Sequence, residues 1–456
     1  MTNQEQGPSR EGGNASALAA PSPLNAPSAR GAMREGLIVL IASLIGHLGN
    51  FLFYVVAARS LDPGEFAALA SLTSLALIVL TPISGVQAAM ARDVAQSRAR
   101  GDGNDVTAMI RWLFCRVLVV QVALFALFAA ITPVSSYLFG LSQPTVWLLA
   151  AIWFALATGV QALLGPIQGF SGFPTVGWVL AGPLGILRLL FLFPLVLLLG
   201  LHGALLALIL ATLVGSATVL WSLRGTLRPI RGLTRARHPG DPTHLLGLPV
   251  GCLLAFAAIT NIDIVTAKIR LAPEVAATYS SAALLGKVAL YATVSLGFVL
   301  LPKVSERITR GLDYAKATLL TLLTVVGVGL LTATTFLLAS DRLIVAIFGS
   351  AYAQAGNLIF PITLIMTGAG ILNVHLTIAI AARDRGFGFA FVGLAVIHFA
   401  ALLVFGKSTG MLIAANAIVI GSAITLIELF STHGVVRMLV RLRIPEGQSR
   451  RRTTAQ

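Results

Sequence analysis

Two positively charged side chains lie in the middle of long apolar segments, where charge is rare and costly. Arg188 follows the run Ala181-Gly-Pro-Leu-Gly-Ile-Leu, and Lys287 follows Gly286. A charge at the centre of a membrane-spanning helix costs about 2.5–3.5 kcal/mol on insertion scales, so it usually faces a cavity or a partner. Because both are cations, a cavity that contains them suits an anion such as a phosphate or diphosphate headgroup. The alternative is a purely structural contact with a backbone carbonyl or a carboxylate.

Two other titratable side chains also lie within apolar segments. Asp263, near the C-terminal end of its segment, is expected to be either a proton or cation site or the structural partner of a nearby Arg or Lys. His47 is in the middle of the first segment. An imidazole changes charge near neutral pH, so proton coupling is one role for it, although a lone histidine on an apolar face is more often a packing residue.

Residue patterns that support enzymatic chemistry are absent from the sequence. There is no Walker lysine loop, no H-E-x-x-H, no G-x-S-x-G and no zinc-ligand spacing. Cys115 and Cys252 both lie in apolar segments and offer neither a disulfide framework nor a metal site. We therefore expect a protein that is not an enzyme and has no cofactor or metal.

The composition identifies the elements that must position these charges. Of the 456 residues, 57% are hydrophobic and only 11% are charged, and the mean hydropathy is +0.89. A soluble domain carries roughly 25% charged residues, because its surface faces water. A cytosolic enzyme, a disordered protein and a disulfide-rich secreted domain are excluded, and an all-α polytopic membrane protein remains. In such a chain the net charge of +15 indicates cytoplasmic loops on anionic membrane lipid rather than nucleic-acid binding.

Apolar segments long enough to cross a bilayer recur along the whole chain, since about 20 residues suffice for one helix. They predict twelve transmembrane helices near 37–57, 67–90, 112–132, 146–167, 175–199, 203–222, 246–267, 278–301, 317–339, 356–381, 387–406 and 411–433. The fifth and sixth are separated only by the turn Gly200-Leu-His-Gly203.

The basic residues predict the orientation of these helices, because Lys and Arg concentrate in cytoplasmic loops. With the N-terminus inside, 24 basic residues fall on the cytoplasmic side and five on the outer side: Arg59, Lys268, Arg270, Arg342 and Lys407. The chain is therefore expected to be a multi-pass protein of the plasma (inner) membrane with both termini cytoplasmic.

The sequence also predicts two halves. We expect a disordered cytoplasmic tail at 1–34, a six-helix bundle at 35–223, a basic cytoplasmic linker at 224–244, a second six-helix bundle at 245–436 and a basic tail at 437–456. An ordinary positive-inside loop explains the linker equally well on charge alone. A weak repeat favours two bundles, because Asn50 precedes Arg59 by nine residues, as Asn261 precedes Arg270. Six helices per half give a parallel repeat about a pseudo-two-fold axis along the membrane normal.

Several short motifs resemble those of one transporter family. The stretch Asn50-Phe-Leu-Phe-Tyr-Val-Val-Ala-Ala-Arg59-Ser-Leu-Asp-Pro-Gly-Glu-Phe66 resembles the opening signature of polysaccharide-biosynthesis flippases of the Wzx type, such as O-antigen flippases, within the multidrug/oligosaccharidyl-lipid/polysaccharide (MOP) exporter superfamily. Further similar motifs, in order, are Gln168-Gly-Phe170, Arg188-Leu189, Gly200-Leu-His-Gly-Ala204, Asn261-Ile-Asp263, Gly286-Lys287, Leu301-Pro-Lys-Val-Ser305 and Phe348-Gly-Ser-Ala-Tyr352. The resemblance covers about 36–430 and departs from the family at Ala67, where glycine is common.

The resemblance implies a V-shaped pair of bundles around a cavity with lateral access. It implies translocation of a polyprenyl-diphosphate-linked oligosaccharide to the outer leaflet, driven by an ion gradient, with a polysaccharide polymerase and glycosyltransferases as partners. On this hypothesis Arg188 and Lys287 hold the diphosphate, Arg59 and Asp263 act at the outer gate, and His47 is a coupling candidate. Two alternatives stay open: a multidrug antiporter of the same fold, which needs cavity carboxylates for cationic drugs, and a non-transporting scaffold in envelope biogenesis.

Overall fold

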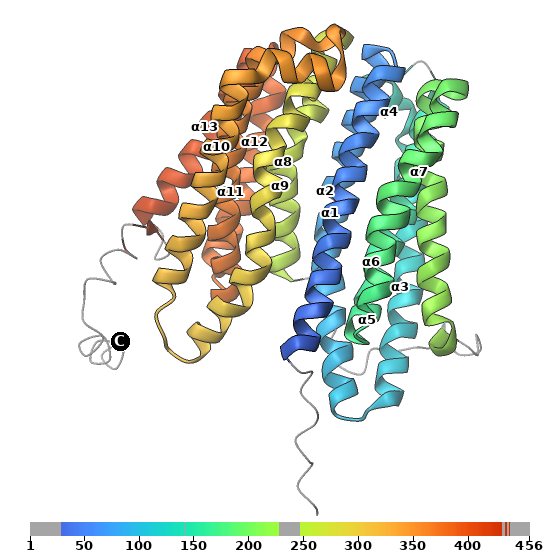
Figure 1. Ribbon diagram of the computed structural model, residues 1–456, viewed down its shortest axis with the longest axis vertical. Helices are drawn as coiled ribbons and strands as arrows, with labels where there is room; N and C mark the ends of the chain where they lie inside the picture. Colours follow the sequence, from blue (N-terminus) through green and yellow to red (C-terminus); the bar gives the residue numbers. More distant parts are fainter. Residues whose placement is uncertain (1–28, 142, 228–246, 431–433, 436, 438–456) are drawn as a thin grey trace, which may run out of the picture.

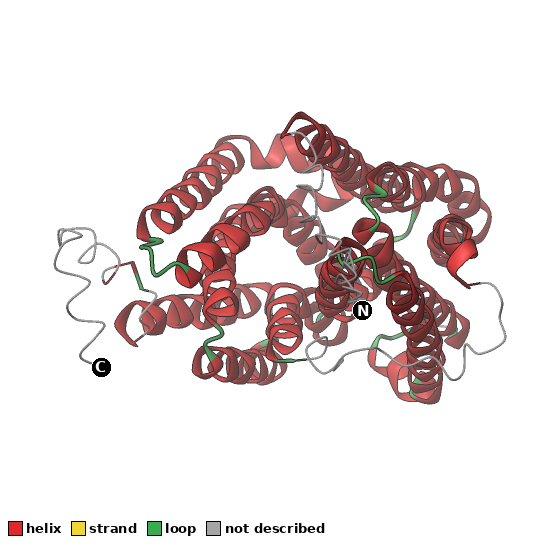
Figure 2. Cartoon of the chain, turned by 90° about the horizontal axis from the view of Figure 1, so that it is seen from below, coloured by secondary structure: helices red, strands yellow, loops and turns green. Residues whose placement is uncertain are grey.

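The computed structural model describes residues 29–141, 143–227, 247–430, 434, 435 and 437, and every regular element among them is a helix (Figures 1 and 2). The helices are α1 (Ala29–Ser60), α2 (Pro63–Ala99), α3 (Gly103–Ala130), α4 (Thr132–Leu138), α5 (Pro144–Gly169), α6 (Phe173–Ala181), the π-helical segment Gly182–Leu187, α7 (Arg188–Leu227), α8 (Leu248–Arg270), α9 (Pro273–Thr309), α10 (Ala315–Phe348), the short 3₁₀ segment Ser350–Ala355, α11 (Gly356–Ala382), α12 (Arg385–Phe405) and α13 (Thr409–Phe430).

The predicted tails and linker fall largely outside the described residues. The structure does not describe most of 1–34, most of 224–244 or nearly all of 437–456. The N-terminal boundary differs from the prediction, because α1 begins at Ala29, inside the segment expected to be disordered. Alanine, arginine, methionine and glutamate between this residue and the first apolar run have high helix propensity, so the helix extends before its membrane-spanning part.

The chain has ten helical segments that are long and apolar enough to cross a membrane, with mean hydropathies of 1.8 to 2.5. Twelve were expected, and the difference arises at two places. The segment Phe173–Leu227 counts once because helix follows helix without a loop over its 55 residues, and α9 is not among the ten. The protein is therefore a multi-pass, all-helical membrane protein in its described part.

The long segment Phe173–Leu227 folds back on itself at Gly200. This residue has φ 53° and ψ −130°, a conformation that glycine adopts without steric cost. On its two sides the backbone of Gly203 packs directly against Leu195, and Gly215 lies beside Pro183. The two arms therefore run antiparallel.

Helices α1–α7 pack mainly against one another, and so do α8–α13. Among the first group, α2 packs on α5, α5 on α3 and α7, and α1 on α6; among the second, α9 packs on α11, α11 on α10 and α13, and α8 on α12. The largest contact between the groups is that of α2 with α8 and α9. One apolar core runs through both groups and includes Phe66, Phe154, Phe348 and Leu402.

The two groups meet differently on their two sides. Helices α2 and α8 are antiparallel neighbours along much of their length. At one end Lys268 Nζ donates a hydrogen bond to the carbonyl oxygen of Gly64, and further along a methyl group at Gly85 would lie 3.1 Å from the side chain of Leu253. Helix α1, which stands between the groups in Figure 1, has no comparable packing against α9 in the described chain. We call the end where α1 leads into α2 and α8 into α9 the gate end, and the end where α1 begins and α11 leads into α12 the tail end.

Candidate functional site

Arg188 lies at the middle depth of the helices and contacts α1. It is twelve residues from the reversal at Gly200, about 18 Å along a helix, in a membrane core about 30 Å thick. Its Nη1 donates a hydrogen bond of 2.6 Å to Oδ1 of Asn50. Tyr54 follows Asn50 by four residues, so it lies on the same face of α1. The site therefore combines a cation with an amide and a phenol from the facing helix.

Close backbone packing places Arg188 against α1. The π-helical segment Gly182–Leu187 directly precedes it, and such segments occur often at functional sites. On α1, a methyl group at Gly49 would lie 2.7 Å from the carbonyl carbon of Gly185, and one at Gly46 would lie 2.7 Å from the carbonyl oxygen of Leu180. Only glycine permits this approach, which brings Asn50 to the guanidinium.

The charge of Arg188 is not balanced by a carboxylate within the described chain. The ion pairs of the described residues do not include it, and its buried Nε has no hydrogen-bond partner. The residue as a whole is partly exposed, whereas its Nε is buried. A guanidinium with an unused donor and no carboxylate partner among the described residues can bind an anion once the surrounding helices open to it.

Lys287 has a different environment, because a cluster of three polar side chains from α8 and α9 surrounds it. Its Nζ is 3.1 Å from Oδ1 of Asn261 and 3.7 Å from Oδ1 of Asp263. The hydroxyl of Tyr279 donates a 2.9 Å hydrogen bond to Oδ2 of the same carboxylate. Lys287 and Asp263 are each 1% exposed. In this conformation Lys287 is therefore paired with a carboxylate, which is the structural alternative that the sequence leaves open for it.

The structure does not bring Asp263 to Arg59, with which it was grouped as an outer gate. The carboxylate points to Lys287 inside the second group of helices, whereas Arg59 lies at the gate end. Arg59 Nε donates a 2.9 Å hydrogen bond to the carbonyl oxygen of Ile347, and its Nη2 donates one to the carbonyl oxygen of Ala346. A cation at the C-terminus of a helix, here α10, is also favoured by the helix dipole.

Two more bonds join the groups at the gate end, and both use backbone acceptors. Tyr352 donates from its hydroxyl to the carbonyl of Ala58 at 3.3 Å, and Lys268 Nζ is 3.4 Å from the carbonyl of Gly64. Below them the rings of Phe66 and Tyr352 meet edge to face with centroids 5.4 Å apart. The gate end is therefore closed by polar bonds over an aromatic layer.

His47 is exposed and makes one inter-group contact. Its ring stacks on that of Tyr291 of α9, with centroids 6.4 Å apart and an angle of 15° between the planes. Tyr291 is 42% exposed. His47 precedes Asn50 by three residues and Tyr291 follows Lys287 by four, so each pair lies on one face of its helix.

Sequence reasoning missed several residues of this site. The sequence shows Asn50 and Asn261 as a repeat but does not predict their contacts. Asn50 accepts a hydrogen bond from Arg188 in the first half, and Asn261 accepts one from Lys287 in the second. Tyr279 and Tyr291 were not singled out, and Tyr352 was named only as the end of a motif. Helical spacing from Lys287 could have indicated Tyr291, but nothing in the sequence places Tyr352 beside α1.

Comparisons with known proteins show the fold. No family model matches the sequence, and no curated protein matches it. Solved structures do match, each covering 90% of this chain: an inward-facing multidrug resistance MATE transporter of the MOP superfamily (13% identity, 99% of that chain, TM-score 0.61) and the MATE transporter VcmN from Vibrio cholerae (16%, 97%, 0.58). A third is a MOP superfamily transporter from Pyrococcus furiosus, described as having a binding pocket of reverse polarity that suggests a different function (15%, 97%, 0.51). The chain therefore has a MATE-like fold.

Proposed function

We propose that the protein is a flippase that moves a polyprenyl-diphosphate-linked oligosaccharide across the plasma membrane for cell-surface polysaccharide assembly. It works by alternating access driven by an ion gradient. Glycosyltransferases supply its substrate, and a polymerase receives the translocated product. The observation that carries the proposal is Arg188, a mid-depth cation without a carboxylate partner among the described residues. A fold-level likeness supports transport, and the site supports the substrate class.

The balance of charge at middle depth favours an anionic substrate. Asp263 is the carboxylate near this depth in the described helices, and Lys287 neutralises it at 3.7 Å. Arg188 is left with a neutral amide. A diphosphate offers the oxygen acceptors that a guanidinium binds best. The prediction that Lys287 is a second diphosphate ligand requires its pair with Asp263 to open in another conformation.

The packing supports twelve passes in two six-helix bundles related by a parallel pseudo-two-fold. The reversal at Gly200 divides Phe173–Leu227 into two antiparallel arms, and α9 with 37 residues is about 55 Å long. The contacts of α1 with α6, α2 with α5 and α5 with α7 correspond to those of α8 with α12, α9 with α11 and α11 with α13. With the basic loops inside, the gate end faces outward and both termini are cytoplasmic.

A lipid-linked substrate needs access from the side, and the α1 side offers it. The α2–α8 side is packed from Gly64 to Gly85, whereas α1 and α9 meet mainly through His47 and Tyr291. In this conformation the gate end is closed, so the diphosphate would reach Arg188 beside α1 from the cytoplasmic leaflet. His47 and Tyr291 then stand where a titrating ring could link a proton to the movement of the bundles.

The second candidate is multidrug antiport, since the similar solved structures include multidrug resistance MATE transporters. It predicts a carboxylate that is free to bind a cationic drug, and Asp263 is already paired. A non-transporting scaffold is the third candidate, and it predicts that Arg188 is dispensable while the tails are not.

Purified protein in proteoliposomes separates these candidates. The probes are a fluorescent undecaprenyl-diphosphate-linked disaccharide and the cationic dye ethidium, each with an imposed proton or sodium gradient. We expect gradient-dependent movement of the lipid-linked saccharide and none of the dye. Movement of the dye alone would establish the antiporter, and movement of neither would favour the scaffold.

A further inference from the structure

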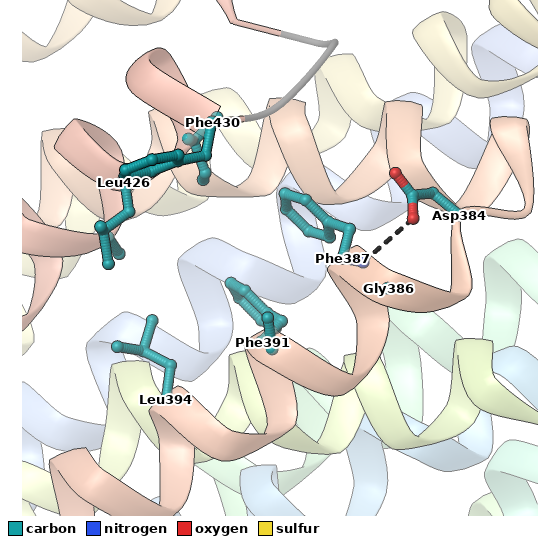
Figure 3. Close-up of a pocket in the computed structure, with 10 residues that line it drawn as sticks. Asp384, Gly386, Phe387, Phe391, Leu394, Leu426 and Phe430 are labelled. Atoms are coloured by element: carbon teal, nitrogen blue, oxygen red, sulfur yellow. Dashed lines mark hydrogen bonds between the residues drawn. The ribbon is translucent and has the colours of Figure 1, made fainter.

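A second site lies away from Arg188, in a pocket of about 370 Å³ between α12 and α13 (Figure 3). The rings of Phe387 and Phe391 stack with centroids 5.9 Å apart on one wall, and Leu426 and Phe430 of α13 lie across from them. Apart from Asp384 at its mouth, the lining is apolar. Its volume lies within the range of small-molecule sites.

The pocket runs into the membrane from the tail end. Its lining extends along α12 from Gly386 to Leu394, which is about 12 Å of helix. The mouth is at the first turn of α12, and the far end lies among side chains at hydrocarbon depth. A hydrocarbon chain that enters at the headgroup level therefore fits the direction of the pocket.

The residues next to the mouth of the pocket carry more positive than negative charge. Arg383 and Arg385 flank Asp384 in the chain and are both exposed, and the exposed Arg437 bonds the carbonyl of Leu429, next to Phe430. The carboxylate of Asp384 accepts a 3.0 Å hydrogen bond from the backbone nitrogen of Phe387, so it caps α12. Three exposed arginines therefore lie near the mouth of the pocket in the chain or by a hydrogen bond, next to lining residues of α12 and α13.

From this combination we infer that the pocket binds one anionic phospholipid, with an acyl chain between α12 and α13 and the phosphate on Arg383 and Arg385. Basic pockets between membrane helices on the cytoplasmic side bind anionic headgroups in this way. The pocket shares no helix with Arg188 on α7 or with Asn50 on α1, so it is separate from the proposed substrate site. The inference does not depend on what the protein transports.

The test measures lipid binding to the purified full-length protein by native mass spectrometry after delipidation. The probes are dioleoyl-phosphatidylglycerol and, as its neutral counterpart, dioleoyl-phosphatidylcholine. We expect one tightly bound phosphatidylglycerol and much weaker phosphatidylcholine. The double variant Arg383→Gln/Arg385→Gln should bind phosphatidylglycerol about thirty-fold more weakly, since each basic group near the surface contributes roughly a fivefold factor.

A matched control is the double variant Arg98→Gln/Arg100→Gln. These two arginines are also exposed, two residues apart and at the tail end, but they lie on α2 and beside it. Replacing them should leave the affinity for phosphatidylglycerol unchanged. A third variant, Ala390→Trp, fills the pocket from an exposed lining position and should abolish binding of both lipids without disturbing the core.

Three results would overturn the inference. One is wild-type affinity in Ala390→Trp, which would place the lipid elsewhere. Another is equal loss in the two arginine double variants, which would indicate general surface charge. The third is displacement of phosphatidylglycerol by equimolar decaprenyl phosphate, which would assign the pocket to the isoprenoid chain of a carrier lipid.

Discussion

The pair of Lys287 and Asp263 gives a quantitative prediction about the second bundle. Replacing Lys287 by methionine leaves a carboxylate that is 1% exposed without its cation. At the observed 3.7 Å, and with an effective dielectric constant of about 20, two unit charges attract by about 4.5 kcal/mol. Removing one partner of a buried pair typically costs 3–5 kcal/mol, so Lys287→Met and Asp263→Asn should each lower the free energy of unfolding by about that much.

The double variant Lys287→Met/Asp263→Asn distinguishes a true pair from two independent residues. With both charges gone, most of the stability should return, and the double-mutant cycle should give a coupling energy of about 2 kcal/mol or more. The measurement is the free energy of unfolding in mixed micelles. The exposed pair of Arg310 and Glu306, although only 3.0 Å apart, is the control and should couple by less than about 1 kcal/mol.

Additive losses in the cycle at Lys287 would refute the pairing. They would mean that Lys287 and Asp263 are apart in the resting protein, as a lysine that is free to hold a diphosphate requires. Transport by a stable double variant would then show whether either charge contacts substrate.

Three further predictions concern the gate end, α1 and His47. Cysteines at Gly64 and Pro273, whose Cβ positions are 3.2 Å apart, should form a disulfide that locks the gate end and stops transport until reductant is added; full transport by the oxidised, cross-linked protein would show that this end does not open. Gly49→Ala should move α1 away from Gly185 and lower both transport and thermal stability, and an unchanged melting temperature would contradict the close packing. If the ring of His47 couples protons, His47→Gln should flatten the pH dependence of transport at normal expression, whereas a packing residue would change the level and leave the profile.

Part of this architecture could be predicted from composition and spacing. Hydropathy alone identifies a multi-pass membrane protein, because a soluble protein of this size could not bury so many long apolar segments. The reversal at Gly200 occurs at the turn between the fifth and sixth expected spans, and the rarity of mid-span charge distinguishes Arg188 and Lys287 from the other basic residues.

The partners of these charges could not be predicted, because they depend on which helix faces which. Asn50 and Arg188 are 138 residues apart, and their contact needs the glycine-mediated approach of α1 to the π-helical segment. Asp263 and Lys287 have opposite charges on consecutive helices, yet only the rotation of α8 and α9 makes them a pair. The grouping of Asp263 with Arg59 therefore had no support from packing, and the structure separates them.

The central claim is that Arg188 binds the diphosphate of the substrate, and its most direct test is the concentration dependence of saccharide-lipid transport by Arg188→Gln. Loss of a charge-assisted hydrogen bond of about 1.5–3 kcal/mol should weaken the apparent affinity for the undecaprenyl-diphosphate-linked disaccharide by roughly 10- to 150-fold. Arg188→Lys should recover part of it, and Arg116→Gln, an exposed arginine of α3 stacked over Trp112, should behave as wild type. Wild-type affinity in a well-folded Arg188→Gln protein would contradict the claim.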